Sequence, residues 1–168
     1  GQDPKLFDGL RSDLTGKGWF ERIDAIGARY GLEIEHYIIS AGLEEMIDGC
    51  PIRDAFHHVF ASKFAYDEHG VAIWPAVGVN YTTKTQYLFR INKDALDLAD
   101  NTAVNAYRAP DQRRVPFANM IFIGDGDTDI PCFRTVKEQG GHSIAVYPTD
   151  DDSRAARTRK LIDEGRVH

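Results

Sequence analysis

Three aspartates at alternate positions directly follow an apolar run and could bind a cation. The run covers residues 120–123, and Asp125, Asp127 and Asp129 come shortly after it. Ionised carboxylates this close repel one another, and a bound divalent cation is the usual means of keeping them charged beside apolar residues. The pattern therefore indicates a cation site at the end of a strand. A solvated Asp/Gly turn is the alternative.

The residues after the acidic loop predict a helix. Asp129 suits its N-cap and Pro131 its first turn, while the spacing of Phe133 and Val136 gives it an apolar face. A calcium EF-hand would need a helix in front of the loop, glycine at the sixth loop position and glutamate at the twelfth. This chain has an apolar strand in front, and Ile130 and Val136 stand at those positions. We therefore predict a strand, an acidic loop and a helix.

A hydroxyl side chain lies at a second predicted strand end. Residues 35–39 form a short run of mostly β-branched and aromatic residues that ends at Ser40, Ala41 and Gly42, and helical spacing resumes at Leu43. Ser40 would thus lie at a strand end just before a helix N-terminus. Such a position is suited to holding an anion.

A lysine lies at the start of another predicted helix. Residues 80–86 begin this helix, and Tyr87, Leu88 and Ile91 form its apolar side. Lys84 falls in the first turn, where a cation opposes the helix dipole, and this placement favours a functional explanation. A solvent-exposed Lys84 is the alternative.

The rest of the chain predicts the elements that position these residues. A helix over 18–30 would bury one face, made up of Trp19, Ile23, Ile26 and Tyr30. Residues 59–66 and 71–74 flank a four-residue turn and predict an appended β-hairpin. A buried strand over 142–147 and a helix from residue 152 follow. Alternating strands and helices favour an α/β fold with a doubly wound parallel sheet, in which ligands bind at the carboxyl ends of the strands.

Composition excludes several classes of function. The 168 residues are 42% hydrophobic and 27% charged, as in one ordinary globular domain, and the net charge of −6 argues against nucleic acid as a partner. No stretch is long and apolar enough for a membrane span, so no membrane partner is expected. Cys50 and Cys132 lack metal-ligand spacing and indicate reduced thiols of a cytoplasmic protein. His57 and His58 would face opposite sides of a strand, which argues against a shared metal.

The order of these motifs is similar to that of a known family. A serine after one apolar strand (Ser40), a lysine at a helix start (Lys84) and Gly-Asp-Gly-x-x-Asp after another strand (residues 124–129) resemble haloacid-dehalogenase-like (HAD) phosphohydrolases, in particular their phosphoserine-phosphatase-like branch. The resemblance covers residues 19–168. It implies a Rossmann-like sheet and a Mg²⁺-dependent phosphatase that acts on a small phosphorylated molecule through an aspartyl-phosphate intermediate.

The resemblance assigns roles to the phosphate-binding residues. Ser40 resembles the hydroxyl that donates a hydrogen bond to a phosphoryl oxygen, and Ala41 and Gly42 continue that motif. Lys84 resembles the cation that neutralises the developing negative charge. Phosphoryl transfer depends chiefly on positioning and charge neutralisation, so these residue types suit the chemistry.

The resemblance also assigns roles to the acidic loop. Asp125 resembles the Mg²⁺ ligand of the family's fourth motif. Asp129 resembles the second acid of that motif, which positions the lysine or a metal-bound water, so the resemblance implies a catalytic role for Asp129 and a metal site formed with Asp125. Asp127 has no fixed role in the family.

One family motif has no counterpart in a predicted strand. The family's nucleophile lies in an Asp-x-Asp sequence at the end of a central strand, and the nearest match here is Asp8, after residues that do not predict a central strand. We therefore expect residues 1–18 to be a lead-in from a cap or linker, and residues 19–168 to be an incomplete HAD-like core without its first strand. This chain alone should then be inactive, and its unpaired strand edges could allow self-association.

Two alternatives remain from the sequence. A natural relative without the nucleophile would bind metal and phosphate without catalysis. A metal-dependent nucleic-acid enzyme using Asp125 and Asp127 would need a basic surface, which the composition does not indicate.

Overall fold

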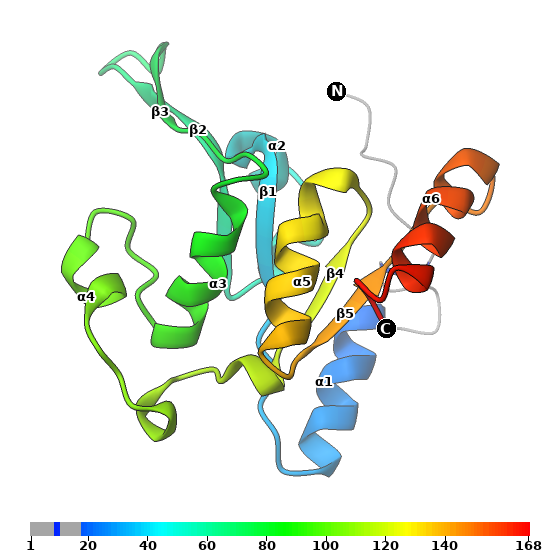
Figure 1. Ribbon diagram of the computed structural model, residues 1–168. Helices are drawn as coiled ribbons and strands as arrows, with labels where there is room; N and C mark the ends of the chain where they lie inside the picture. Colours follow the sequence, from blue (N-terminus) through cyan, green and yellow to red (C-terminus); the bar gives the residue numbers. More distant parts are fainter. Residues whose placement is uncertain (1–8, 11–17) are drawn as a thin grey trace. The chain divides into compact units, whose positions relative to one another are not determined.

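The computed structural model describes residues 9–10 and 18–168 and has a mixed α/β fold (Figure 1). The chain divides into two compact units, Gly1–Val79 and Asn80–His168. Asp8, the nearest match to a nucleophile, lies outside the described residues. No helix in the described ranges is long and apolar enough to cross a membrane.

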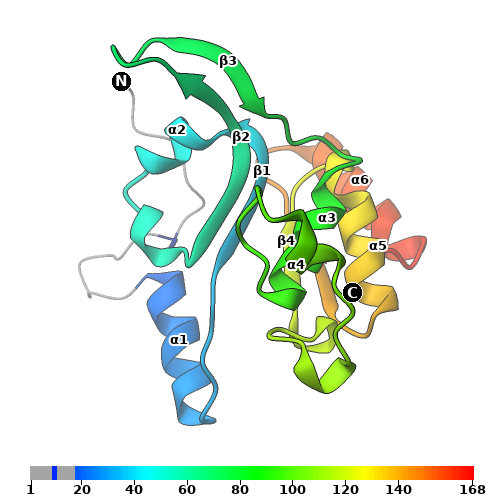
Figure 2. The ribbon, with the colours of Figure 1, turned by 90° about the vertical axis from the view of Figure 1, so that its left-hand side faces the viewer.

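The described part of the first unit is built on a three-stranded sheet. Strand β2 lies in the middle, parallel to β1 and antiparallel to β3 (Figure 2). The predicted hairpin, β2–β3, is confirmed, and it extends the sheet because β2 also pairs with β1. The elements are α1 (Trp19–Arg29), β1 (Tyr37–Leu43), α2 (Glu44–Asp48), the 3₁₀ helix η1 (Arg53–Ala55), β2 (His58–Tyr66) and β3 (Ala72–Val77).

Helix α1 forms where the sequence predicts it, but its buried face differs from the prediction. Phe20 and Gly27 are buried, whereas Ile26 and Tyr30 are exposed. Gly27 explains the difference, because a Cβ atom there would lie 2.5 Å from Cγ1 of Ile34. The helix therefore approaches Ile34 along the side of Gly27, while Trp19 and Ile23, the other two residues of the predicted face, are half-buried.

The described part of the second unit contains a two-stranded parallel sheet, β4–β5, joined through helix α5 (Figure 1). A parallel pair needs a crossover of this kind. The elements are α3 (Lys84–Lys93), α4 (Asn101–Asn105), the 3₁₀ helices η2 (Pro110–Gln112) and η3 (Phe117–Asn119), β4 (Ile121–Gly124), η4 (Asp127–Asp129), α5 (Ile130–Glu138), β5 (His142–Ala145) and α6 (Asp152–Asp163).

The core of this unit forms largely as predicted. Phe133 and Val136 of α5 are fully buried. The three apolar residues predicted for α3 are also buried, namely Tyr87, Leu88 and Ile91. Gly141 allows the turn from α5 to β5 to pack closely, because a Cβ atom there would clash with the carbonyl oxygen of Phe117 and with Val136.

Strand β5 is shorter and less buried than predicted. It ends at Ala145 rather than Tyr147, and Ser143 is buried while Ile144 is 41% exposed. Ile121 and Ile123 of β4 are also exposed, at 66% and 43%. Parallel strands are normally covered on both faces, so one face of this small sheet is uncovered. The described strands form two separate sheets, and a single doubly wound sheet therefore stays a prediction.

The polar region after α3 is organised by a buried cation. Arg90 is 3% exposed, and its guanidinium donates hydrogen bonds to the carbonyl oxygens of Ala95 (3.0 Å), Asp97 (2.8 Å) and Asp100 (3.3 Å). The side chain of Asp100 in turn caps α4, where it accepts hydrogen bonds from two backbone N–H groups. This segment is thus held by hydrogen bonds to its backbone rather than by an apolar core.

Candidate functional site

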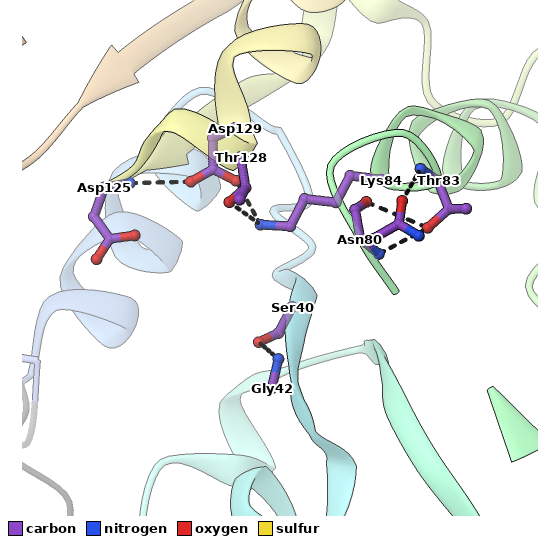
Figure 3. A network of polar contacts seen from close by, with 8 residues as sticks. All are labelled: Ser40, Gly42, Asn80, Thr83, Lys84, Asp125, Thr128 and Asp129. Carbon is purple, nitrogen blue, oxygen red and sulfur yellow. Dashed lines mark hydrogen bonds and ion pairs between the residues drawn. The ribbon is translucent and has the colours of Figure 1, made fainter. Parts of the chain in front are cut away.

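A buried ion pair lies at the centre of the candidate site. Nζ of Lys84, the first residue of α3, lies 2.6 Å from Oδ1 of Asp129, and the two residues are only 6% and 4% exposed (Figure 3). Nζ is also 3.5 Å from Oγ1 of Thr128. The structure therefore excludes the solvent-exposed alternative for Lys84, and it brings together two residues that lie 45 positions apart.

The turn before α3 is built to present Lys84. Oδ1 of Asn80 accepts hydrogen bonds from the backbone N–H groups of Thr82 and Thr83, and Oγ1 of Thr83 accepts one from the N–H of Asn80. The N–H of Lys84 donates to the carbonyl oxygen of Asn80 at 3.0 Å. These reciprocal bonds satisfy N–H groups that a helix start leaves without partners. Asn80 and Thr83 were not among the predicted site residues, although an Asn-x-x-Thr spacing before a helix is a recognisable signal.

Asp129 occupies the N-cap position of α5, as predicted, but its side chain does not cap that helix. Instead, Oδ1 pairs with Lys84, and Oδ2 accepts a hydrogen bond from the N–H of Asp125 at 3.2 Å. Both carboxylate oxygens therefore have partners. The geometry suits the positioning of Lys84 better than direct coordination of a metal.

Gly124, at the end of β4, makes room for this carboxylate. A Cβ atom at Gly124 would lie 2.6 Å from Oδ2 and 2.8 Å from Cβ of Asp129. Any larger residue would push Asp129 away from Lys84. Gly124 is thus a site residue that the sequence analysis did not identify, because the need for glycine arises from a contact five residues further along the chain.

The other two acids of the loop are open to solvent. The side chains of Asp125 and Asp127 are 59% and 73% exposed, in contrast to Asp129. Arg154 Nη1 lies 3.7 Å from Oδ2 of Asp125, and Arg157 Nη1 lies 3.9 Å from Oδ2 of Asp127. Two arginines of α6 therefore face the acidic loop, a contact that the sequence analysis did not predict.

The fit of a divalent cation rests on Asp125. The described residues contain no cluster of three or more His, Cys, Asp or Glu side chains arranged to hold a metal. Mg²⁺ is often bound through one or two carboxylates, with water and substrate oxygens completing its octahedron. An exposed Asp125 carboxylate at the end of a strand fits that mode, whereas a site made entirely from protein ligands does not.

Ser40 does not lie at the predicted strand end. β1 continues through Ser40 to Leu43, and α2 begins at Glu44, so no helix N-terminus adjoins the hydroxyl. Regular pairing with β2 is interrupted between Ile39 and Leu43. In this interruption the N–H of Gly42 donates to Oγ of Ser40 at 3.0 Å (Figure 3). A local side-chain bond of this kind competes with regular strand pairing.

The first turn of α2 is also unfavourable for an anion. It begins with Glu44 and Glu45, whose negative charges offset the positive end of the helix. Glu45 is held by the hydroxyl of Tyr66, which donates to Oε1 at 2.6 Å. An anion at Ser40 would therefore depend on the hydroxyl and on local backbone N–H groups rather than on α2.

Cys132 lies next to the ion pair but is not available as a nucleophile. It is fully buried, and burial, reinforced by the negative charge of Asp129, raises the pKa of its thiol to about 12. The thiol thus stays protonated at neutral pH, and a thiolate is the reactive form. Its role is to pack α5.

Comparisons with known proteins identify no family for this chain. No protein-family model matches it, and no solved structure matches it. The chain is 26% identical over 170 residues to an uncharacterized protein of Borreliella burgdorferi, and this alignment covers 89% of the chain and 56% of the relative. The chain therefore spans little more than half the length of that relative.

Proposed function

We propose that this chain is part of a Mg²⁺-dependent phosphohydrolase of the HAD type, acting on a small phosphorylated molecule. The observation that carries the proposal is the buried pair of Lys84 and Asp129 beside the exposed carboxylate of Asp125. A positioned cation from α3, next to a loop that carries a candidate metal ligand, suits the transfer of a phosphoryl group, which depends on positioning and charge neutralisation.

Lys84 is the proposed phosphate-binding cation. Its ammonium has three N–H donors, of which Asp129 and Thr128 engage two among the described residues. The third is left for a phosphoryl oxygen. The fixed ammonium needs no rearrangement as negative charge develops on the transferred group, and such preorganisation is a large part of electrostatic catalysis.

Ser40 is the proposed hydroxyl donor, with Ala41 and Gly42 as its neighbours in the phosphate-binding motif. Its oxygen accepts the N–H of Gly42, which leaves the O–H of Ser40 free to donate to a phosphoryl oxygen. The residue is half-buried, so a ligand can reach it.

Asp125 would hold Mg²⁺, and the bound cation would supply positive charge next to the phosphoryl oxygens. Asp129, the other proposed metal-centre acid, would act through Lys84, because both its oxygens already have partners. The nucleophilic carboxylate is assigned to a strand outside the described residues.

The strand edges support an incomplete doubly wound sheet. Among the described strands, β1 pairs with β2 alone and β4 pairs with β5 alone. Each therefore leaves one edge open, which a further parallel strand could occupy. Self-association of the chain through these edges belongs to the same proposal. Sedimentation of the chain at two concentrations measures self-association directly, because the apparent mass of the chain should then rise with concentration.

Phosphate binding tests the proposal without requiring a nucleophile. Calorimetric titration of the chain with inorganic phosphate should give binding that strengthens at least several-fold with Mg²⁺. The variant Lys84→Met/Asp129→Leu replaces the pair by apolar residues of similar size and should lose that binding. Ser40→Ala should weaken it. Lys160→Met removes the same charge from the exposed face of α6 and serves as the control. Equal binding by all variants would refute the phosphate site.

Hydrolysis of an aryl phosphate completes the test. The chain should be inactive alone, because no predicted strand in its sequence ends in the Asp-x-Asp motif that carries the nucleophile in the HAD family. Mg²⁺-dependent turnover that Asp125→Asn abolishes would instead place the nucleophile within the 168 residues, with Asp8 the first residue to substitute. Phosphate binding without turnover in any longer form of the protein would favour the non-catalytic relative.

The nucleic-acid enzyme is the weaker candidate. Its two proposed metal ligands, Asp125 and Asp127, face arginines of α6, but the net charge of −6 offers no electrostatic attraction for a polyanion. Salt-sensitive binding of DNA or RNA by the chain would support it.

A further inference from the structure

The arginines of α6 contact the two acidic side chains of the loop that remain open to a cation. Arg154 reaches Oδ2 of Asp125 at 3.7 Å, and Arg157 reaches Oδ2 of Asp127 at 3.9 Å. The two arginines lie three positions apart and so project from the same side of the helix. One helix face therefore carries two positive charges toward two negative ones.

A capping residue at the N-terminus of α6 helps to orient Arg154. Asp151 caps the helix by accepting the N–H of Arg154 at 3.0 Å and the hydroxyl of Ser153 at 2.7 Å. Its other oxygen, Oδ2, lies 3.4 Å from Nε of Arg154. The guanidinium of Arg154 thus bridges Asp151 and Asp125, which directs it toward the acidic loop.

These contacts are weak enough to be exchanged. All four side chains of the two pairs are between 48% and 73% exposed. Exposed ion pairs contribute little to stability and are screened by salt. A divalent cation carries twice the charge of a guanidinium, so it can displace Arg154 from Asp125. The buried pair of Lys84 and Asp129 has no such exposure and would remain in place.

We propose that Arg154 and Arg157 set the metal affinity of the acidic loop by competing with the divalent cation for Asp125 and Asp127. This inference rests on the proposed function, which takes Asp125 as the metal ligand, and it adds Asp127 as a second exposed carboxylate of the same loop that the cation would attract. In the metal-free chain the arginines neutralise the loop and hold α6 against it. With a divalent cation bound to the loop, Arg154 and Arg157 would lose these two contacts.

Calorimetric titration with Mg²⁺ tests the competition directly. The variant Arg154→Gln/Arg157→Gln should bind Mg²⁺ roughly three- to ten-fold more tightly than the unaltered chain, since each displaced exposed pair accounts for a factor of a few. Arg159→Gln is the matched control, because it removes the same charge from an exposed position of the same helix. It should change the affinity by less than about two-fold.

Hydrogen exchange of α6 gives a second measurement that does not depend on activity. Mg²⁺ should speed amide exchange in residues 152–163 of the unaltered chain by a factor of a few at most, because the exposed pairs that it would displace contribute little to stability. In the double variant exchange should be fast already and insensitive to Mg²⁺. Asp125→Asn should speed exchange even without Mg²⁺, because it removes the partner of Arg154.

The outcomes separate the two proposals. Mg²⁺ binding that the double variant tightens no more than Arg159→Gln does would overturn this inference and leave the proposed function standing. An absence of Mg²⁺ binding in the unaltered chain and in the double variant would overturn the proposed metal site itself, and the inference with it.

Discussion

Lys84 and Asp129 form a salt bridge of 2.6 Å in which neither side chain is more than 7% exposed. Removing charges from water in this way is costly unless they are paired. The second carboxylate oxygen of Asp129, Oδ2, accepts a hydrogen bond from the N–H of Asp125. The pair therefore ties the start of α3 to the acidic loop, and its two halves depend on each other.

Removing one half of this pair should be more damaging than removing both. Lys84→Met leaves an uncompensated buried carboxylate and should lower the free energy of unfolding by about 3 to 5 kcal/mol. Lys84→Met/Asp129→Leu should recover most of that loss. Urea unfolding of the two single variants and the double variant gives the coupling. Lys63→Met, which breaks an exposed contact to Glu44 at 3.6 Å, should cost less than about 1 kcal/mol. Additive losses in the cycle would contradict the coupling.

Gly124 should tolerate no side chain. Gly124→Ala places a methyl group 2.6 Å from Oδ2 of Asp129 and should cost roughly 1 to 3 kcal/mol through steric displacement. It should also weaken phosphate binding, because Lys84 would lose its anchor. Gly126→Ala is the control, since no atom lies within 4 Å of the added methyl and its φ of −150° suits any residue. Equal effects of the two substitutions would show that Asp129 is free to move.

His58 should make the stability of the chain depend on pH. Burial is the largest effect and lowers the pKa of its imidazole from the ordinary 6.5. The negative charge of Glu44 opposes this shift, and the positive charges nearby lower the pKa slightly further (His57, Arg53 and Lys63). Protonation therefore favours the unfolded chain. The stability that neutral His58 provides is complete above about pH 6.5 and is lost as the pH falls below that value.

The substitution His58→Asn should reduce this dependence on pH. Between pH 8 and pH 5 the melting temperature of the variant should fall less than that of the unaltered chain. Substitution of His57, the exposed neighbour, by asparagine controls for loss of a histidine from the same segment. Identical pH profiles for the unaltered chain and His58→Asn would show that His58 does not cause the pH dependence of the melting temperature.

Arg90 should stabilise the region between α3 and α4. Its guanidinium satisfies three carbonyl oxygens, and Arg90→Met would leave them without a charged donor. We expect a loss of about 2 to 3 kcal/mol in unfolding free energy. Amide exchange over residues 94–105 should rise most. Arg159→Met, on the exposed face of α6, should leave both measurements nearly unchanged, and a uniform rise across the chain would argue against a local role for Arg90.

Local patterns in the sequence predicted the parts of the site that depend on neighbours in the chain. The strand, acidic loop and helix around Asp125 follow from hydrophobic runs and a proline within about fifteen positions, although Asp129 at the N-cap position does not cap the helix with its side chain. The helix that starts at Lys84 follows from the spacing of its apolar residues. These features are confirmed because both the signal and its cause lie in one short segment.

Features that depend on distant contacts were missed or predicted wrongly. The spacing of Ile26 and Tyr30 indicated a buried face for α1, but close packing at Gly27 against Ile34 decides which face is buried. The sequence predicts a strand over residues 35–39, whereas β1 continues to Leu43, because Leu43 pairs with Ser62 of β2 and this contact leaves no local signal. The contact of Arg154 with Asp125 spans 29 positions and leaves no local signal.

The close approach of Gly124 to Asp129 also constrains how this protein can diverge over evolution. A side chain at position 124 and an acid at position 129 cannot share the space that the backbone provides. Drift at either position should therefore be accompanied by change at the other, and loss of the acid would leave Lys84 as a buried charge under selection for replacement. The three positions should covary as a set, which gives a way to sort distant homologues into those that retain the buried lysine and those that have abandoned it.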